Sequence, residues 1–245
     1  MFELKKVRSG AVAVCRIAML AAAGVLVVGA TAADAAGGSV VGKVMLKGTP
    51  PPPAAPVKVA ANPEKCGAQH EPDAMVGPGG SVRWAVVRIV GAKGQFSAQA
   101  PPPTLDQRTC RFMPHVVVVP VGQALKVLNS DGILHNVHTF PTKNTPMNSA
   151  QPGFRKTMDA TFTAPETVRV GCDVHPWMGA HIVVTDTPFV AVTDENGAFS
   201  IEGVPAGTYT VSIWHETFGE QTQQVTVTEG QKTNLSVAMA AKGGD

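Results

Sequence analysis

The sequence predicts an all-β protein, and three observations support this fold class. Apolar and polar residues alternate at period two in most segments, as in residues 40–47, which is the pattern of a half-buried strand. Proline runs at 50–53 and 101–103 cannot lie in a central strand and predict exposed connections. We find no helical periodicity over the length of an ordinary helix. Because aromatic residues make up only 5% of the chain, we expect β-sandwiches filled mainly by valine.

The expected strands follow one another along the chain. Before residue 188 they are residues 81–90, 115–119, 124–128, 167–170 and 182–185. Residues 141–160, rich in Thr, Asn, Pro and Gly, are expected to form a long irregular loop. After Phe189 we expect tight hairpins, with strands at 190–193, 198–201, 208–214, 223–228 and 232–239. Asn196 and Gly197 favour a hairpin turn between the first two because both residues tolerate positive φ.

The first 36 residues resemble a secretory signal peptide. Four basic residues precede an apolar run at 17–28, and small residues of an A-x-A type follow. The alternative is an uncleaved membrane anchor, but the run is shorter than the ~20 residues that a bilayer span needs. We expect a periplasmic or secreted protein with no membrane span after signal cleavage.

Charge and cysteine content sharpen this expectation. The whole chain carries a net charge of +2, which argues against a nucleic-acid binder, and removing the signal leaves 16 basic and 16 acidic residues. It also leaves Cys66, Cys110 and Cys172, so at least one thiol is unpaired within the monomer. Cys66 and Cys110 lie in polar, loop-like contexts, and we expect them to form a disulfide. The alternative is that Cys172 is half of a disulfide.

The most informative segment is residues 171–178, Gly-Cys-Asp-Val-His-Pro-Trp-Met. Cys172, His175 and Met178 supply a thiolate, an imidazole and a thioether just after a predicted strand, and His135 supplies a second imidazole from another strand end. A His₂Cys set with a weak axial Met is typical of blue-copper electron-transfer sites. Zinc also binds Cys and His, but this donor set is not a usual structural zinc site. The remaining alternative is that Met178 is only a core residue.

These residues resemble the copper loop of the plastocyanin/amicyanin-like cupredoxins, which are type 1 blue copper proteins, over about residues 110–187. The resemblance implies one copper ion, with His135, Cys172 and His175 as equatorial ligands and Met178 as the axial ligand. It also implies that the Asn136 amide ties the upstream strand to the ligand loop. Ala180 stands where the family usually has glycine. The implied fold is a Greek-key β-sandwich.

The C-terminal run TDENGAFSIEGVPAGTYTV resembles the carboxypeptidase regulatory-like domain, a small transthyretin-like β-sandwich. Residues 40–59 resemble the opening strand of such a domain, so the N-terminus could pack on the C-terminal module with the middle region inserted. By sequence position, we divide the chain into a signal peptide at 1–36, an N-terminal β segment with Pro-rich linkers at 37–104, a cupredoxin-like copper domain at 105–187 and a carboxypeptidase regulatory-like β-sandwich at 188–241.

The other histidines are expected to be structural. His138 lies three residues from His135, so on a strand the two face opposite sides and should not share a metal. His115, His138 and His215 are read as polar residues at strand ends or in the C-terminal module, with a weak accessory site as the alternative. His181 is expected to face solvent or a hydrogen-bond partner.

We therefore expect an exported mononuclear blue copper protein that relays single electrons and is not an enzyme. His175 is expected to be the exposed edge for electron exchange, with an apolar docking patch around Pro176 and Trp177. The resemblance implies a c-type cytochrome or a dehydrogenase as redox partner. The alternatives are a periplasmic copper carrier or resistance protein, and a cell-surface β module with a structural metal.

Overall fold

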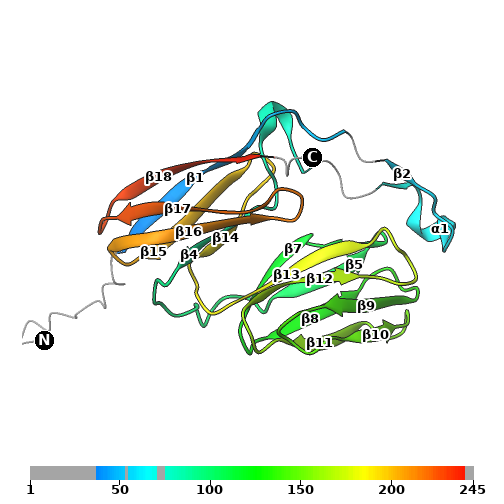
Figure 1. The fold of residues 1–245 in the computed structure, drawn as a ribbon. Coiled ribbons are helices and arrows are strands. Elements are labelled where there is room, and N and C mark those ends of the chain that lie inside the picture. The colour runs from blue at the N-terminus through cyan, green and yellow to red at the C-terminus, as the bar shows by residue number, and fades with distance from the viewer. Residues whose placement is uncertain (1–36, 53–54, 71–74, 241–245) are drawn as a thin grey trace, which may run out of the picture. The chain divides into compact units, whose positions relative to one another are not determined.

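The computed structural model describes residues 37–52, 55–70 and 75–240 (Figure 1). The signal peptide expected at 1–36 lies outside these residues. Strands dominate, and the helices are a single turn, α1 (Pro63–Cys66), and a 3₁₀ turn, η1 (Pro78–Gly80). The all-β prediction is therefore confirmed. Among the described residues, no helix has the length and apolar character needed to cross a membrane.

One sandwich is built by two sheets from the middle of the chain. The five-stranded sheet has the order β10-β9-β12-β13-β7 and the four-stranded sheet the order β11-β8-β5-β6. Their bounds are β5 (Thr104–Arg108), β6 (Arg111–Met113), β7 (Val116–Pro120), β8 (Ala124–Asn129), β9 (His135–Phe140), β10 (Asn148–Gln151), β11 (Thr157–Thr161), β12 (Glu166–Gly171) and β13 (Gly179–Thr185). Alternation fills the space between the sheets, since Leu125 and Val127 of β8 point inward while their neighbours Ala124 and Lys126 are exposed.

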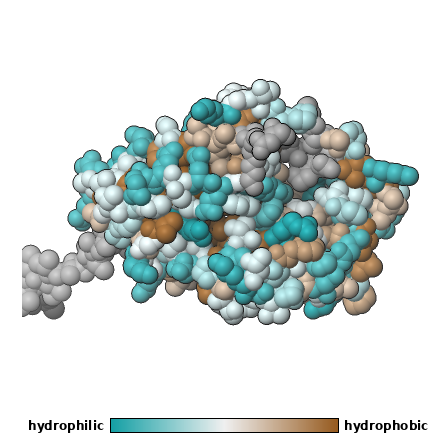
Figure 2. Space-filling view, viewed as in Figure 1, coloured by the Kyte–Doolittle hydropathy of each residue, from teal (hydrophilic) through white to brown (hydrophobic). Residues whose placement is uncertain are grey.

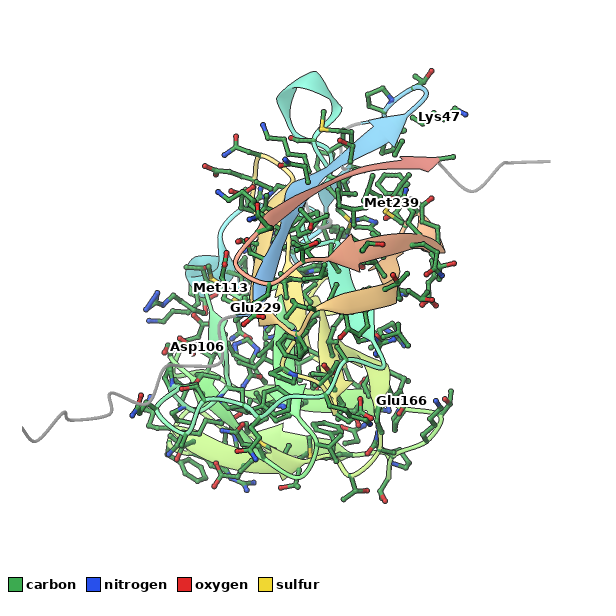
Figure 3. All side chains as sticks on the ribbon, turned by 90° about the vertical axis from the view of Figure 1, so that its left-hand side faces the viewer. Lys47, Asp106, Met113, Glu166, Glu229 and Met239 are labelled. Carbon is green, nitrogen blue, oxygen red and sulfur yellow. A yellow bond between two sulfur atoms is a disulfide. The ribbon has the colours of Figure 1, made fainter. Side chains whose placement is uncertain are left out.

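The second sandwich combines strands from both ends of the chain. Its sheets have the orders β15-β1-β18 and β14-β4-β16-β17. The bounds are β1 (Gly38–Lys47), β4 (Val86–Val90), β14 (Val190–Val192), β15 (Ala198–Val204), β16 (Gly207–His215), β17 (Gly219–Val227) and β18 (Lys232–Ala240). Figure 1 shows β1 beside β18, and Figure 3 shows Lys47 and Met239 near the same end of this pair. A separate two-stranded sheet pairs β2 (Pro56–Val57) with β3 (Gln69–His70).

The first sandwich is thus an insertion in the second. β1 lies between β15 and β18, and β4 lies between β14 and β16, so the segment 37–104 is not a domain of its own. The insertion leaves and re-enters at neighbouring points, since the Thr187 hydroxyl donates a hydrogen bond to the Ala92 carbonyl at 3.3 Å. A division of the chain by sequence position cannot represent this arrangement.

Two local expectations are wrong. Asn196-Gly197 does form a tight turn, closed by Gly197 N–H on the Asp194 carbonyl, but β14 and β15 lie in different sheets, so the turn is a corner between sheets and not a hairpin. The strand expected at 81–90 begins only at Val86, because Trp84 has φ +60° and breaks the extended run.

The loop expected at 141–160 is also partly strand, since β10 and β11 lie within it. The first turn of this segment, at residues 142–144, is organised by the carboxylate of Glu166, which is labelled in Figure 3. This carboxylate accepts hydrogen bonds from the backbone N–H groups of Thr142, Lys143 and Asn144. Burial by itself would raise the pKa of Glu166, but hydrogen bonds from the side chains of Thr142 and Asn144 and from these backbone N–H groups outweigh it and lower the pKa to about 2.

Glu166→Gln is expected to remove stability that wild type holds above about pH 4.5 and loses between pH 4.5 and 2. The sign follows because a depressed carboxyl pKa stabilises the folded state while the group is ionised. Thermal unfolding from pH 6 to 2 measures the effect, with exposed Glu229→Gln as the control. The two variants should converge with wild type near pH 2. A gap that stays constant across this range would contradict the prediction.

Candidate metal centre

The sheet order of the inserted sandwich brings the four predicted ligands together. His135 is the first residue of β9, Cys172 follows β12, and His175 and Met178 lie in the loop that leads into β13. Because β9, β12 and β13 are neighbours, these positions meet at one end of the sheet. All four side chains are buried, with exposed fractions between 0% and 4%.

The three equatorial candidates form a compact triangle. His135 Nδ1 lies 2.9 Å from His175 Nδ1, and Cys172 Sγ lies 3.9 Å and 3.8 Å from these two nitrogens. The point equidistant from the corners of such a triangle lies about 2.1 Å from each, within the range of metal–nitrogen and metal–sulfur bonds of ~2.0–2.3 Å. The triangle therefore has the size that a single transition ion requires.

The outer ring nitrogens fix which atoms face the centre. His135 Nε2 lies 2.9 Å from the carboxylate of Asp131, and His175 Nε2 lies 3.2 Å from the amide oxygen of Asn62. Both oxygens accept hydrogen bonds, so the Nε2 atoms carry the protons and the Nδ1 lone pairs face each other. Burial lowers the pKa of both histidines, which keeps the rings neutral. Two facing lone pairs are an arrangement that a bound cation stabilises.

Cys172 is the free cysteine of the described chain and lies at the third corner. Burial raises the pKa of its thiol, and backbone N–H groups of Asn136, His175 and Val174 act in the opposite direction by hydrogen bonding to the sulfur. A metal ion displaces the proton of such a thiol on binding. The donor set of one thiol and two neutral imidazoles therefore fits copper, and Met178 is a buried thioether that lines the same groove as Cys172.

Asn136 holds the ligand loop against β9. Its amide oxygen accepts a hydrogen bond from the Asp173 N–H at 2.6 Å, and its Nδ2 donates to the Asp173 carboxylate at 2.9 Å and to Asn148 Oδ1 at 2.7 Å. The amide thus connects β9, β10 and the residue after Cys172. This is the structural position that the family resemblance implies for Asn136.

Two residues that orient the ligands were missed in the sequence. Asp131 binds His135 and also accepts hydrogen bonds from the N–H groups of Thr109 and Cys110, and Asn62 binds His175 from a segment more than a hundred residues away. The one sequence signal for Asn62 is its closeness to Cys66, whose bridge to Cys110 brings that segment to the site.

His175 is not the exposed edge that we expected. It is completely buried, because Asn62 covers its Nε2 side and the Trp177 ring packs edge-on at 5.2 Å. Trp177 is itself only 8% exposed and donates its indole N–H to the Cys110 carbonyl, so it shields the centre. Of the expected docking patch, Pro176 alone is exposed.

Access to the centre lies on the Cys172 side. A groove of about 460 Å³ is lined by Cys172, Met178, Val57, Pro176 and Phe140. Phe140 is 40% exposed, and the Arg169 guanidinium lies over its ring at 3.7 Å. The sulfur ligands of the candidate centre therefore border an apolar groove.

The disulfide of the structure joins Cys66 to Cys110, 44 residues apart, which is the pairing that we expected. The disulfide also excludes two further clusters as metal sites, because its sulfurs are no longer free thiols. One cluster joins both cysteines to His175, and the other joins Cys110 to Asp131 and His135. The bridge ties the segment that carries Asn62 over the centre.

Removing this bridge in a Cys66→Ala/Cys110→Ala variant is expected to cost about 4 kcal/mol of unfolding free energy, from the entropy of a loop this long. It should also expose the centre, so that Cys172 in the metal-free protein reacts faster with a thiol reagent. Urea unfolding and reaction with Ellman's reagent measure the two effects. Unchanged thiol reactivity would show that the bridge does not hold the cover in place.

The structure also places the other histidines that the sequence analysis considered. His138 lies on the opposite face from His135, and its Nδ1 pairs with the Asp173 carboxylate at 2.9 Å. His215 is buried, stacks on Phe218 and has a pKa lowered to about 4 by burial. His181 faces neither solvent nor, through Nδ1, a hydrogen-bond partner within the described residues, since it is buried beside His115 and Glu216.

Comparison with known proteins gives a partial family match. The family model of the carboxypeptidase regulatory-like domain matches residues 152–240. This match covers less than half of the chain and spans strands β11 to β18, so it begins well upstream of the expected module at 188–241. No curated protein matches the chain in sequence.

Solved structures with a similar fold include copper proteins. A copper-containing nitrite reductase from Thermus scotoductus SA-01 is 24% identical, with a TM-score of 0.33, and the match covers 39% of this chain and 25% of that one. A methionine-to-alanine variant of amicyanin in its Cu(I) form is 19% identical (TM-score 0.32), covering 40% and 98%. A purple cupredoxin from Nitrosopumilus maritimus is 17% identical (TM-score 0.29), covering 34% and 98%.

This chain therefore spans a quarter of the nitrite reductase and nearly all of the two smaller proteins. The expected all-β fold class with two β-sandwiches is confirmed by the strands and the sheet orders. At these TM-scores the likeness carries no argument about function, so any functional assignment rests on the geometry of the site.

Proposed function

We propose that this protein is an exported, amicyanin-like blue copper protein that relays single electrons, with one type 1 copper ion held by His135, Cys172, His175 and Met178. The observation that carries the proposal is the buried triangle of two facing Nδ1 lone pairs and one free thiol. Copper bound to such a set changes between Cu(II) and Cu(I) with little rearrangement, which is the chemistry of electron transfer.

The burial of the ligands favours a relay over a copper carrier. A carrier that exchanges its ion requires ligands that a partner can reach, whereas His135 and His175 are fully buried. Asp131 and Asn62 hold the outer nitrogens of both rings, and such contacts fix ligand orientation in either copper state. The proposal includes no catalytic step on a bound substrate.

The groove beside Cys172 is the proposed place of electron exchange. It brings solvent-exposed carbon atoms of Phe140 and Pro176 close to the thiolate ligand. On the face drawn in Figure 2, hydrophobic residues lie in small groups among hydrophilic ones. The mature chain is nearly neutral, so docking depends on apolar contact more than on charge steering. A c-type cytochrome or a dehydrogenase is the partner that this proposal names.

Export is part of the proposal. The expected signal peptide lies outside the described residues, but the Cys66–Cys110 disulfide is a bond that persists in oxidising compartments such as the periplasm. A copper thiolate protein with a structural disulfide fits that location.

Electron self-exchange tests the relay function. In mixtures of the Cu(I) and Cu(II) forms, NMR line broadening should show fast exchange, and Phe140→Ser should slow it at least tenfold without changing the visible spectrum. Val121→Ser is the control, because Val121 is similarly exposed but follows the end of β7 that lies far from the ligand loop. Slow exchange in wild type, or equal rates in both variants, would contradict the proposed route.

A further inference from the structure

We propose that His115, His181 and Glu216 form a second metal site, separate from the centre at Cys172, that binds a divalent transition ion of the zinc type. His115 immediately precedes β7 and His181 lies in β13, and these parallel neighbours are joined there by the His181 N–H on the His115 carbonyl at 2.8 Å. Glu216 comes from the turn between β16 and β17, in the other sandwich. The three residues meet although 101 positions separate His115 from Glu216.

The geometry of the three side chains suits a single ion. One ligand atom from each lies within 4.8 Å of the other two. His181 Nδ1 is 3.5 Å from Glu216 Oε2, while His115 Nε2 is hydrogen-bonded directly to Glu216 Oε1, a bond that a bound ion would replace. Ligands at ~2.0–2.1 Å around a tetrahedral ion are themselves separated by roughly 3.3 Å. Two imidazoles and one carboxylate form a donor set that zinc uses when its fourth position stays open.

An unpaired nitrogen marks the cluster as a site for a ligand. The His181 side chain is 11% exposed, and its Nδ1 has no hydrogen-bond partner within the described residues. Its nearest acidic atom is the Glu216 oxygen at 3.5 Å, which is too long for a hydrogen bond. Buried polar atoms without partners are rare and point to an unseen water or ion. An ion between His181 and Glu216 would satisfy this nitrogen.

The electrostatics keep the ligands in the states that bind metals. Burial by itself would raise the pKa of Glu216, but the hydrogen bond from the His115 ring counteracts burial and helps to hold it below its usual value. Burial lowers the pKa of His181, so that ring is neutral. An ionised carboxylate and a neutral imidazole are the forms that coordinate a cation.

The surroundings shape the site and leave it an entrance. The Trp84 ring lies 4.3 Å from the His115 ring, and the Trp214 ring lies 5.1 Å from the His181 ring. A second groove, of about 650 Å³, is lined by His115, Trp84 and Met178, so solvent reaches His115 from this groove. An ion bound here would connect the two sandwiches, because its ligands come from both.

Zinc titration of the tag-free mature protein tests the site. The protein is first given one equivalent of copper, and Zn(II) is then added by isothermal titration calorimetry in a non-chelating buffer. One further equivalent of Zn(II) should bind, and Glu216→Gln and His181→Ala should each weaken it at least tenfold. His138→Ala is the matched control and should bind zinc like wild type, since His138 pairs with Asp173.

Two additional measurements keep the result independent of the copper centre and of misfolding. Cys172→Ser, without copper, should still bind one Zn(II), which a site dependent on the thiol would not do. In wild type, Zn(II) should protect His115 and His181 from carbethoxylation, as read by mass spectrometry. Absence of a second equivalent, loss of zinc in Cys172→Ser, or unprotected His115 and His181 would each overturn the proposal.

Discussion

A chain in which residues 93–187 are excised, and Ala92 is joined to Pro188 through a short Gly-Ser linker, is expected to fold cooperatively as the second sandwich alone. Residues 188–240 by themselves are expected to stay unfolded. The reason is the position of β1 and β4, which are central strands of the two sheets although they lie before residue 91. A short linker suffices because Thr187 and Ala92 are hydrogen-bonded at the ends of the insertion.

The expected effect is large because β1 and β4 carry much of the core. Val40, Val44, Val87 and Ile89 are completely buried. Each such side chain contributes roughly 1.5–3 kcal/mol by burial, and the four together rival the ~5–15 kcal/mol stability of a whole domain. Without β1, the facing edges of β15 and β18 also lose their hydrogen-bond partners.

Circular dichroism and urea unfolding of the two polypeptides measure this prediction. A third polypeptide, residues 103–187 with Cys110→Ala, serves as the control, because β5 to β13 are contiguous and need no strand from elsewhere. It should fold and retain its ligand loop. Cooperative unfolding of residues 188–240 alone would show that the C-terminal module is independent of β1 and β4.

Period-two alternation predicted many of the strands that carry it, although not β11. β18 is an example, since Leu235, Val237 and Met239 alternate with exposed residues over its whole length. β10 was missed because its sequence Asn-Ser-Ala-Gln has no apolar alternation, and its buried residue is Gln151, whose side chain is satisfied by Gln107 and by backbone. A polar strand whose burial depends on hydrogen bonds far along the chain has no local signal.

The candidate site was predictable where its residues lie close in sequence. Cys172, His175 and Met178 share one loop, and their spacing is visible without a structure. Asn62 and Glu216 act through contacts more than a hundred residues away, with His175 and with His115 respectively. The same distance in sequence explains why His175 was expected to be exposed, since nothing near it shows that Asn62 covers it.

Cys172→Ser is expected to abolish the blue-copper character of the site completely. The thiolate is the ligand that gives a type 1 centre its intense visible absorption, and a serine hydroxyl remains protonated and binds copper weakly. The substitution replaces one buried sulfur atom with a smaller oxygen atom, so the fold should persist. Copper affinity should fall by at least a hundredfold.

Met178→Ala should keep the band and shift the redox potential, because the axial thioether is a weak ligand.

The most direct measurement is the absorption and EPR spectrum of the mature protein loaded with one equivalent of Cu(II). The account predicts an intense thiolate-to-copper band in the visible range and a narrow copper hyperfine splitting, both absent in Cys172→Ser and present in the control His138→Ala. A colourless wild-type protein, or a visible band that survives in Cys172→Ser, would contradict the assignment of His135, Cys172, His175 and Met178 as a blue copper centre.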